Sequence, residues 1–151
     1  MKRIPYSDTS VTIGRSIEQV RELLFKYGAE GVNFNEDMNG SFNITFFYNK
    51  MIVSLRFNIN GYISAIKNNQ PRRRQRMTDE ANKIKAAKIM YRHAFGYLKT
   101  TLEAVDFGLL SFESAFMSHF QAPSGMTLGE ILVPKLQEFS DGRLLLTEKT
   151  K

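Results

Sequence analysis

Residues 42–59 read FNITFFYNKMIVSLRFNI, and this stretch decides the predicted fold. A two-residue turn at Asn49-Lys50 places Tyr48 opposite Met51. Because side chains alternate between faces along a strand, one register then pairs apolar residues four times in succession: Tyr48 with Met51, Phe46 with Val53, Ile44 with Leu55 and Phe42 with Phe57. A slip of one residue would turn polar side chains into the core, so the pattern fixes an antiparallel hairpin.

A third strand is predicted before this hairpin, around Val32 and Phe34. A two-residue turn at Asn39-Gly40 would set asparagines opposite the core positions of the next strand. A three-residue loop, 38–40, instead pairs Phe34 with Ile44 and Val32 with Phe46. We therefore predict the longer loop, with Gly40 in the left-handed region of a bulged turn.

Helix-capping residues predict where helices begin and end in the rest of the chain. Ser16, followed by Gln19, predicts a helix over 17–27 that Gly28 ends. Residues 60–77 are expected to form a basic, polar connection. Thr78 then caps a long helix with an apolar stripe from Ile84 to Val105.

Two shorter helices are predicted near the C-terminus. Ser111 caps one that runs through Phe120, and Thr127 with Glu130 forms the capping box of the other. The sequence thus predicts an α+β fold, an antiparallel sheet of three or four strands with an N-terminal helix and a C-terminal helical half of one long and two short helices. Its length of 151 residues favours one domain: helix plus sheet in 1–62, a basic loop in 63–77, helices in 78–140 and a tail in 141–151.

Composition narrows the protein class. The chain has no Cys, so disulfides, thiolate metal sites and Cys nucleophiles are excluded. It has no apolar run of membrane-spanning length, and its first residues lack the apolar stretch of a signal peptide. We expect a cytoplasmic protein with no membrane partner.

Positive charge is concentrated in residues 50–99, which hold 12 of the 21 Lys and Arg residues and two of the 15 Asp and Glu residues. A concentrated positive field attracts polyanions, and phosphate contacts release condensed counterions. The predicted phosphate contacts are a loop cluster and a helical ridge: Arg72, Arg73, Arg74, Arg76, Lys85, Lys88, Arg92 and Lys99. The competing interpretation is a solvated helix face next to a soluble loop.

The second face of the hairpin carries Phe47, Ile52 and Arg56. An exposed aromatic side chain beside an Arg suits the stacking of single-stranded bases, so Phe47 and Arg56 complete the predicted interface. Alternatively, another helix or a second subunit covers this face, and an uncovered face would favour a homo-oligomer.

No catalytic site or cofactor is predicted. His93 and His119 have no partner ligand at metal-binding spacing. A metal-dependent nuclease would need convergent acids, and Glu103, Asp106 and Glu113 are the nearest group. The hairpin itself has no Asp or Glu, which weighs against a nuclease.

Several stretches resemble a family of uncharacterised phage and prophage proteins. They are Ile4-Pro5-Tyr6, Arg15-Ser16-Ile17-Glu18, Tyr27-Gly28-Ala29, Leu102-Glu103-Ala104-Val105, and residues 112–134 around Phe112-Glu113, His119, Gly129-Glu130 and Pro134. The resemblance implies a viral or prophage origin and a role in phage DNA metabolism, but no residue roles. Together with the charge pattern, it leads us to expect a DNA-binding protein of phage replication or recombination in the host cytoplasm, favouring single strands. A protein–protein module of phage takeover or assembly is the alternative.

Overall fold

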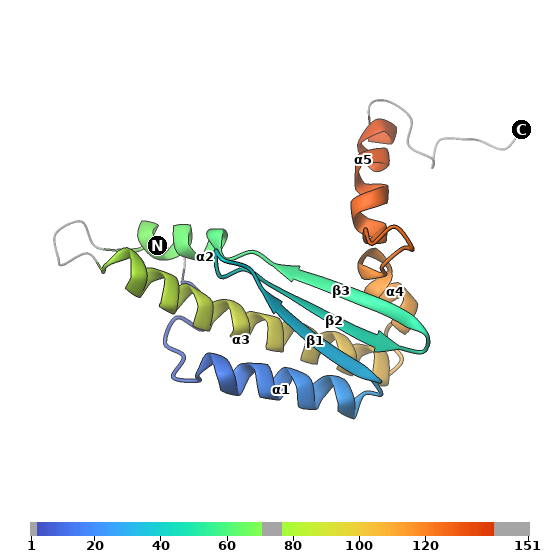
Figure 1. Ribbon diagram of the computed structural model, residues 1–151, viewed down its shortest axis with the longest axis horizontal. Coiled ribbons are helices and arrows are strands. Elements are labelled where there is room, and N and C mark those ends of the chain that lie inside the picture. The colour runs from blue at the N-terminus through green and yellow to red at the C-terminus, as the bar shows by residue number, and fades with distance from the viewer. Residues whose placement is uncertain (1–2, 71–76, 141–151) are drawn as a thin grey trace, which may run out of the picture.

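The computed structural model describes residues 3–70 and 77–140. Its elements follow in the order α1 (Ile13–Lys26), β1 (Gly31–Glu36), β2 (Phe42–Tyr48), β3 (Met51–Phe57), α2 (Asn60–Asn68), α3 (Asp79–Asp106), α4 (Phe112–Phe116), the 3-10 turn η1 (Met117–His119) and α5 (Leu128–Ser140). The architecture is α+β, as predicted: an N-terminal helix, a three-stranded antiparallel sheet and a helical C-terminal half. Figure 1 shows α1 and α3 beside the sheet and α5 standing away from it.

The sheet has the order β1-β2-β3, and its register is the predicted one. Tyr48 lies opposite Met51 and Phe42 opposite Phe57, while Phe34 lies opposite Ile44. The Asn49-Lys50 turn has positive φ at both residues, which is the geometry of a type I′ hairpin turn. The pairing of Phe34 with Ile44 confirms the three-residue loop, and Gly40 has the predicted positive φ, 88°.

The core lies between one face of the sheet and the helices α1 and α3. Phe42 stacks on Tyr91 of α3 with ring centroids 4.0 Å apart, and Phe46 meets Phe116 of α4 edge-on at 5.8 Å. Val20 and Leu24 bring α1 into the same core. Both long helices therefore cover the face that carries the paired apolar residues, and the other face of the sheet points away from them.

The predicted caps at Thr78, Ser111 and Thr127 are confirmed. Each side chain accepts a backbone N–H from the first turn of its helix. Glu130 also accepts the N–H of Thr127 at 2.8 Å, which completes the reciprocal capping box.

Two helix boundaries differ from the prediction. The first helix begins at Ile13, where Thr12 accepts the N–H of Arg15, and the predicted cap Ser16 lies one turn inside it and is 1% exposed. The helix predicted through Phe120 ends at Phe116 and continues as η1, because Phe120 extends to pair with Val53 at the free edge of β3.

The connection predicted over residues 60–77 is wrong in its first half, because residues 60–68 form α2. Ile59, Tyr62, Ile63 and Ile66 recur at helical spacing and pack on α3. Ile84, predicted to begin the apolar stripe of α3, is instead 49% exposed. The four arginines of the predicted loop, 72–74 and 76, lie outside the described residues.

Candidate nucleic-acid interface

Nine outward-facing positions make up the outer sheet face. The register aligns them in three rows across the strands: Gly31–Phe47–Ile52, Asn33–Thr45–Ser54 and Asn35–Asn43–Arg56. The face thus carries an apolar row, a row of amide and hydroxyl groups, and a row with amides and one guanidinium. None of the nine is an acid, so a polyanion would meet no carboxylate among them.

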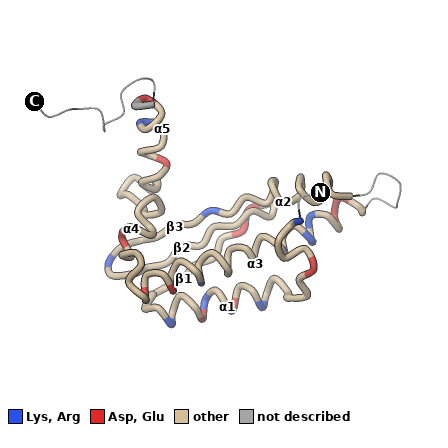
Figure 2. Tube along the Cα trace, turned by 180° about the vertical axis from the view of Figure 1, so that it is seen from behind, with Lys and Arg blue, Asp and Glu red and all other residues tan. Residues whose placement is uncertain are grey.

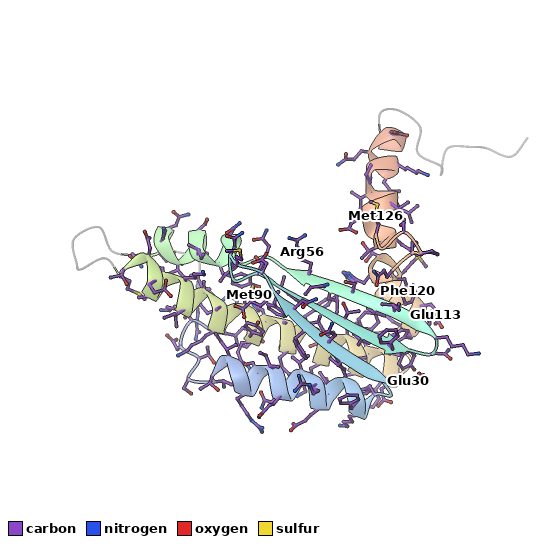
Figure 3. All side chains as sticks on the ribbon, viewed as in Figure 1. Glu30, Arg56, Met90, Glu113, Phe120 and Met126 are labelled. Carbon is purple, nitrogen blue, oxygen red and sulfur yellow. The ribbon has the colours of Figure 1, made fainter. Side chains whose placement is uncertain are left out.

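This outer sheet face has four exposed positions, Asn33, Asn35, Phe47 and Arg56, and its other five positions are half-buried. Phe47 is 45% exposed, although its ring lies close to Gly31, where an added Cβ would be 3.5 Å away. Arg56 is exposed, and Figure 3 shows it on the side of the sheet away from α1 and α3. The alternative that a helix covers this face is wrong for the described part of the chain, apart from one corner near η1 and α5. Coverage by a second subunit stays a prediction.

Hydrogen bonds orient part of the polar row. Ser54 Oγ donates to Asn43 Oδ1 at 3.0 Å, and Asn43 Nδ2 donates to Thr45 Oγ1 at 3.4 Å. The side chains of Asn33 and Asn35 have no hydrogen-bond partner among the described residues. Amides carry both donors and acceptors, so these two groups are free to pair with base edges.

A cavity of about 450 Å³ lies at the covered corner of the outer sheet face. Asn35, Ser54 and Arg56 line it from the sheet, and His119, Thr127 and Glu130 line it from η1 and the start of α5. Burial lowers the pKa of His119, which favours the neutral imidazole, and a neutral imidazole can both donate and accept hydrogen bonds.

The charges around this cavity favour uncharged ligand groups. Among the described residues that line it, Arg56 is the single Lys or Arg, whereas Glu36, Asp37 and Glu130 also line it. Asp37 Oδ1 accepts two backbone N–H groups of its own turn, at 2.9 and 3.0 Å, and Glu130 caps α5. The cavity therefore suits the edge of a base better than a phosphate.

The cations predicted on α3 do not form one ridge. Arg92 donates to Gln19 Oε1 at 2.5 Å and to Ser16 Oγ at 3.4 Å, both on α1, and its guanidinium lies 4.4 Å from the Phe95 ring centroid. Lys99 pairs with Glu103 at 3.9 Å. The prediction of a solvent-facing ridge is therefore wrong at Arg92, which holds α1 to α3.

Lys85 and Lys88 remain available on α3, where they line a separate cavity with the N-terminal segment. Since α3 covers the inner face of the sheet, they lie on the opposite side of the sheet from Phe47 and Arg56. Figure 2 shows the basic residues of α3 and β3 in separate places. The structure thus divides the predicted interface into two surfaces.

Sequence reasoning missed the residues that complete the corner cavity. Asn35 and Asn43 were readable from strand alternation, because they share a face with Arg56. His119, Thr127 and Glu130 carried no such signal, since only the tertiary placement of η1 and α5 brings them to the sheet.

Within residues 3–70 and 77–140, no group of three or more His, Asp or Glu side chains could hold a metal ion. Among the acids of the nuclease alternative, Glu103 pairs with Lys99. In the same part of the chain, no helix combines the length and apolarity needed to cross a membrane.

Comparison of the chain with protein-family models, curated proteins and solved structures finds no match.

Proposed function

We propose that the protein binds single-stranded nucleic acid, with bases on the outer sheet face. The observation that carries the proposal is an open sheet face with no carboxylate among its nine outward positions, on which an exposed Phe47 and an exposed Arg56 flank a row of amides and hydroxyls. In a duplex the flat faces of the bases are already stacked, so this surface suits a single strand.

Each group has a role in the proposal. Phe47 stacks on a base, an interaction worth about 1–3 kcal/mol in single-strand binders. Arg56 stacks its guanidinium plane on a base or donates hydrogen bonds to the edge of a base. Asn33 and Asn35 offer amides that tolerate any base, since each carries both a donor and an acceptor. No cofactor takes part.

The biological setting is also a proposal. The resemblance to phage and prophage proteins supports a role in phage DNA replication or recombination, in the cytoplasm of the host. Binding would then protect or organise exposed single strands.

The test is fluorescence anisotropy with labelled single-stranded and duplex DNA of equal length, across a salt series. We expect tighter binding to the single strand, a steep loss of affinity with salt, and about a 5- to 150-fold loss for Phe47→Ala, which corresponds to the stacking range above. Phe25→Ala is the matched control, because Phe25 is 48% exposed but lies on α1. Equal losses for the two variants would refute the stacking surface.

A specific observation favours a second candidate, a protein–protein module. Helix α5 stands away from the sheet (Figure 1) and exposes Leu132, Val133 and Leu136 along one side. Residues at i, i+1 and i+4 share a helical face, so these side chains form one apolar strip. If this strip binds a second copy of the chain, Leu132→Ser with Leu136→Ser will lower the mass found by sedimentation. If it binds another protein, the same double variant will abolish capture of that partner. In either case the affinity for DNA will not change.

A further inference from the structure

A second cavity lies on the opposite side of the sheet from the outer sheet face. Its volume is about 340 Å³. Ser7 and Thr9 line it from the N-terminal segment, and Ala81, Ile84, Lys85 and Lys88 line it from α3. Its polar lining is therefore two hydroxyl and two ammonium groups, all of which can donate hydrogen bonds.

The N-terminal wall of this cavity is held in place. Ser7 N donates to Ile4 O at 3.2 Å and Thr9 N donates to Tyr6 O at 3.0 Å, which form consecutive turns. Tyr6 has a φ of 61°, a conformation that a bulky residue keeps only where its surroundings determine it. Its ring meets His93 edge-on at 5.0 Å, and its hydroxyl lies so close to Gly96 that an added Cβ would be 2.8 Å away.

The two lysines of the cavity differ from three other cations of the basic segment. Lys67, Arg92 and Lys99 all bind protein acceptors. Lys85 and Lys88 form no ion pair with any described residue, although they are three residues apart on one helical face and are half-buried. Like charges at this spacing repel each other, and an anion bound between them would relieve the repulsion.

The hydroxyl groups are available to the same kind of ligand. Thr9 Oγ1 accepts the N–H of Val11 at 3.3 Å, so its own O–H remains to donate. The Ser7 hydroxyl has no partner among the described residues. Convergent hydroxyl and ammonium donors match the acceptor oxygens of a phosphoryl group.

We infer that Ser7, Thr9, Lys85 and Lys88 bind a phosphoryl group in this N-terminal cavity. The charge pattern favours a backbone phosphate of nucleic acid as the source of this phosphoryl group, and that choice of source rests on the proposed function. The presence of a phosphoryl site does not depend on the proposed function.

The first experiment titrates the full chain with inorganic phosphate at constant ionic strength and follows the backbone amides by NMR. We expect saturable shifts at Ser7, Thr9 and residues 81–88, which disappear in Lys85→Gln with Lys88→Gln. The control, Lys26→Gln with Lys135→Gln, removes two exposed lysines elsewhere and should keep the shifts. No saturable shift in the parent protein, or equal shifts in the double variant, would overturn the site.

The second experiment identifies the source of the phosphate from the salt dependence of oligonucleotide binding. Each single-strand phosphate contact contributes about 0.7 to the slope of log affinity against log salt. The double lysine variant should lower that slope, whereas Phe47→Ala should lower affinity at an unchanged slope. An unchanged slope in the lysine variant would reject the nucleic-acid source and leave free phosphate. If the lysine variant lowers the slope but Phe47→Ala leaves the affinity unchanged, the phosphoryl site is kept and base stacking on the outer sheet face is rejected.

Discussion

Arg92 offers the sharpest contrast between a structural role and the phosphate-binding role that its sequence context predicts. Its guanidinium binds Gln19 and Ser16 on α1 and lies over Phe95. Arg92→Met keeps the aliphatic stem and removes the guanidinium alone. A charge-assisted hydrogen bond contributes about 1.5–3 kcal/mol and a cation–π contact about 0.5–1 kcal/mol, so we expect a loss of about 2–4 kcal/mol in the free energy of unfolding.

The assay is urea unfolding at neutral pH, followed by far-UV circular dichroism and checked against oligonucleotide affinity. In a parallel thermal melt, the midpoint should fall by about 4–16 °C, from about 2–4 °C per kcal/mol at this chain length. Lys88→Met is the control one turn earlier on α3; it should change stability by less than about 0.5 kcal/mol and weaken phosphate binding. The reasoning is refuted if Arg92→Met leaves stability unchanged and weakens oligonucleotide binding as much as Lys88→Met does.

Three further predictions follow from local geometry. Gly40→Ala should cost about 1–2 kcal/mol in urea unfolding, because Gly40 has a φ of 88° and an added Cβ would lie 3.2–3.3 Å from two side chains. Thr127→Ala should cost α5 about 1 kcal/mol by breaking the capping box with Glu130, and hydrogen exchange should speed up in α5 while the sheet stays protected. Burial lowers the pKa of both His93 and His119 from the ordinary histidine value near 6.5, so the unfolded chain binds more protons than the folded chain as the pH falls through that value. The free energy of unfolding should therefore fall as the pH is lowered from about 7.5 to about 5.5. NMR titration should place both pKa values below 6.5, and a rise in stability on acidification would contradict the assignment.

The register of the three strands could be predicted because the information that sets it is local. Alternation in 42–57 fixes which side chains face the core, and the turn residues fix the register, so the two signals can be checked against each other. The β1–β2 loop followed from the same logic, since a single loop length kept Phe34 and Val32 on the apolar face.

Two helices show where local signals compete. Ser16 with Gln19 resembles a capping box, but both side chains bind Arg92, more than 70 residues away, and the sequence gives no sign of this contact. Starting instead at Thr12 lets the helix bury part of Ile13. For α2, the turn-forming pairs Asn60-Gly61 and Asn68-Asn69 favoured a connection, whereas the spacing of the isoleucines between them favoured a helix. The connection was predicted, but the two pairs mark only the ends of the helix.

The sequence does not predict how the candidate cations are distributed over the surface of the fold. A helical wheel places Lys85, Lys88, Arg92 and Lys99 near one another on α3, but it does not show that α1 covers Arg92. Likewise, nothing in the sequence shows that β3 and α3 carry their cations on opposite sides of the sheet. Residues adjacent in the charge profile are therefore separated in space.

This separation has a consequence for the choice of ligand. A nucleic acid that meets both the outer sheet face and the N-terminal cavity must pass around the molecule. Duplex DNA is stiff over about 150 base pairs and resists such a path, whereas a single strand bends freely. Simultaneous contact with both surfaces therefore selects single strands, beyond the stacking at Phe47. Replacing Lys85 and Lys88 should then lower the affinity for both single strands and duplexes, and should also lower the ratio of single-strand to duplex affinity. If both affinities fall by the same factor in the anisotropy assay, the two surfaces do not act on one strand.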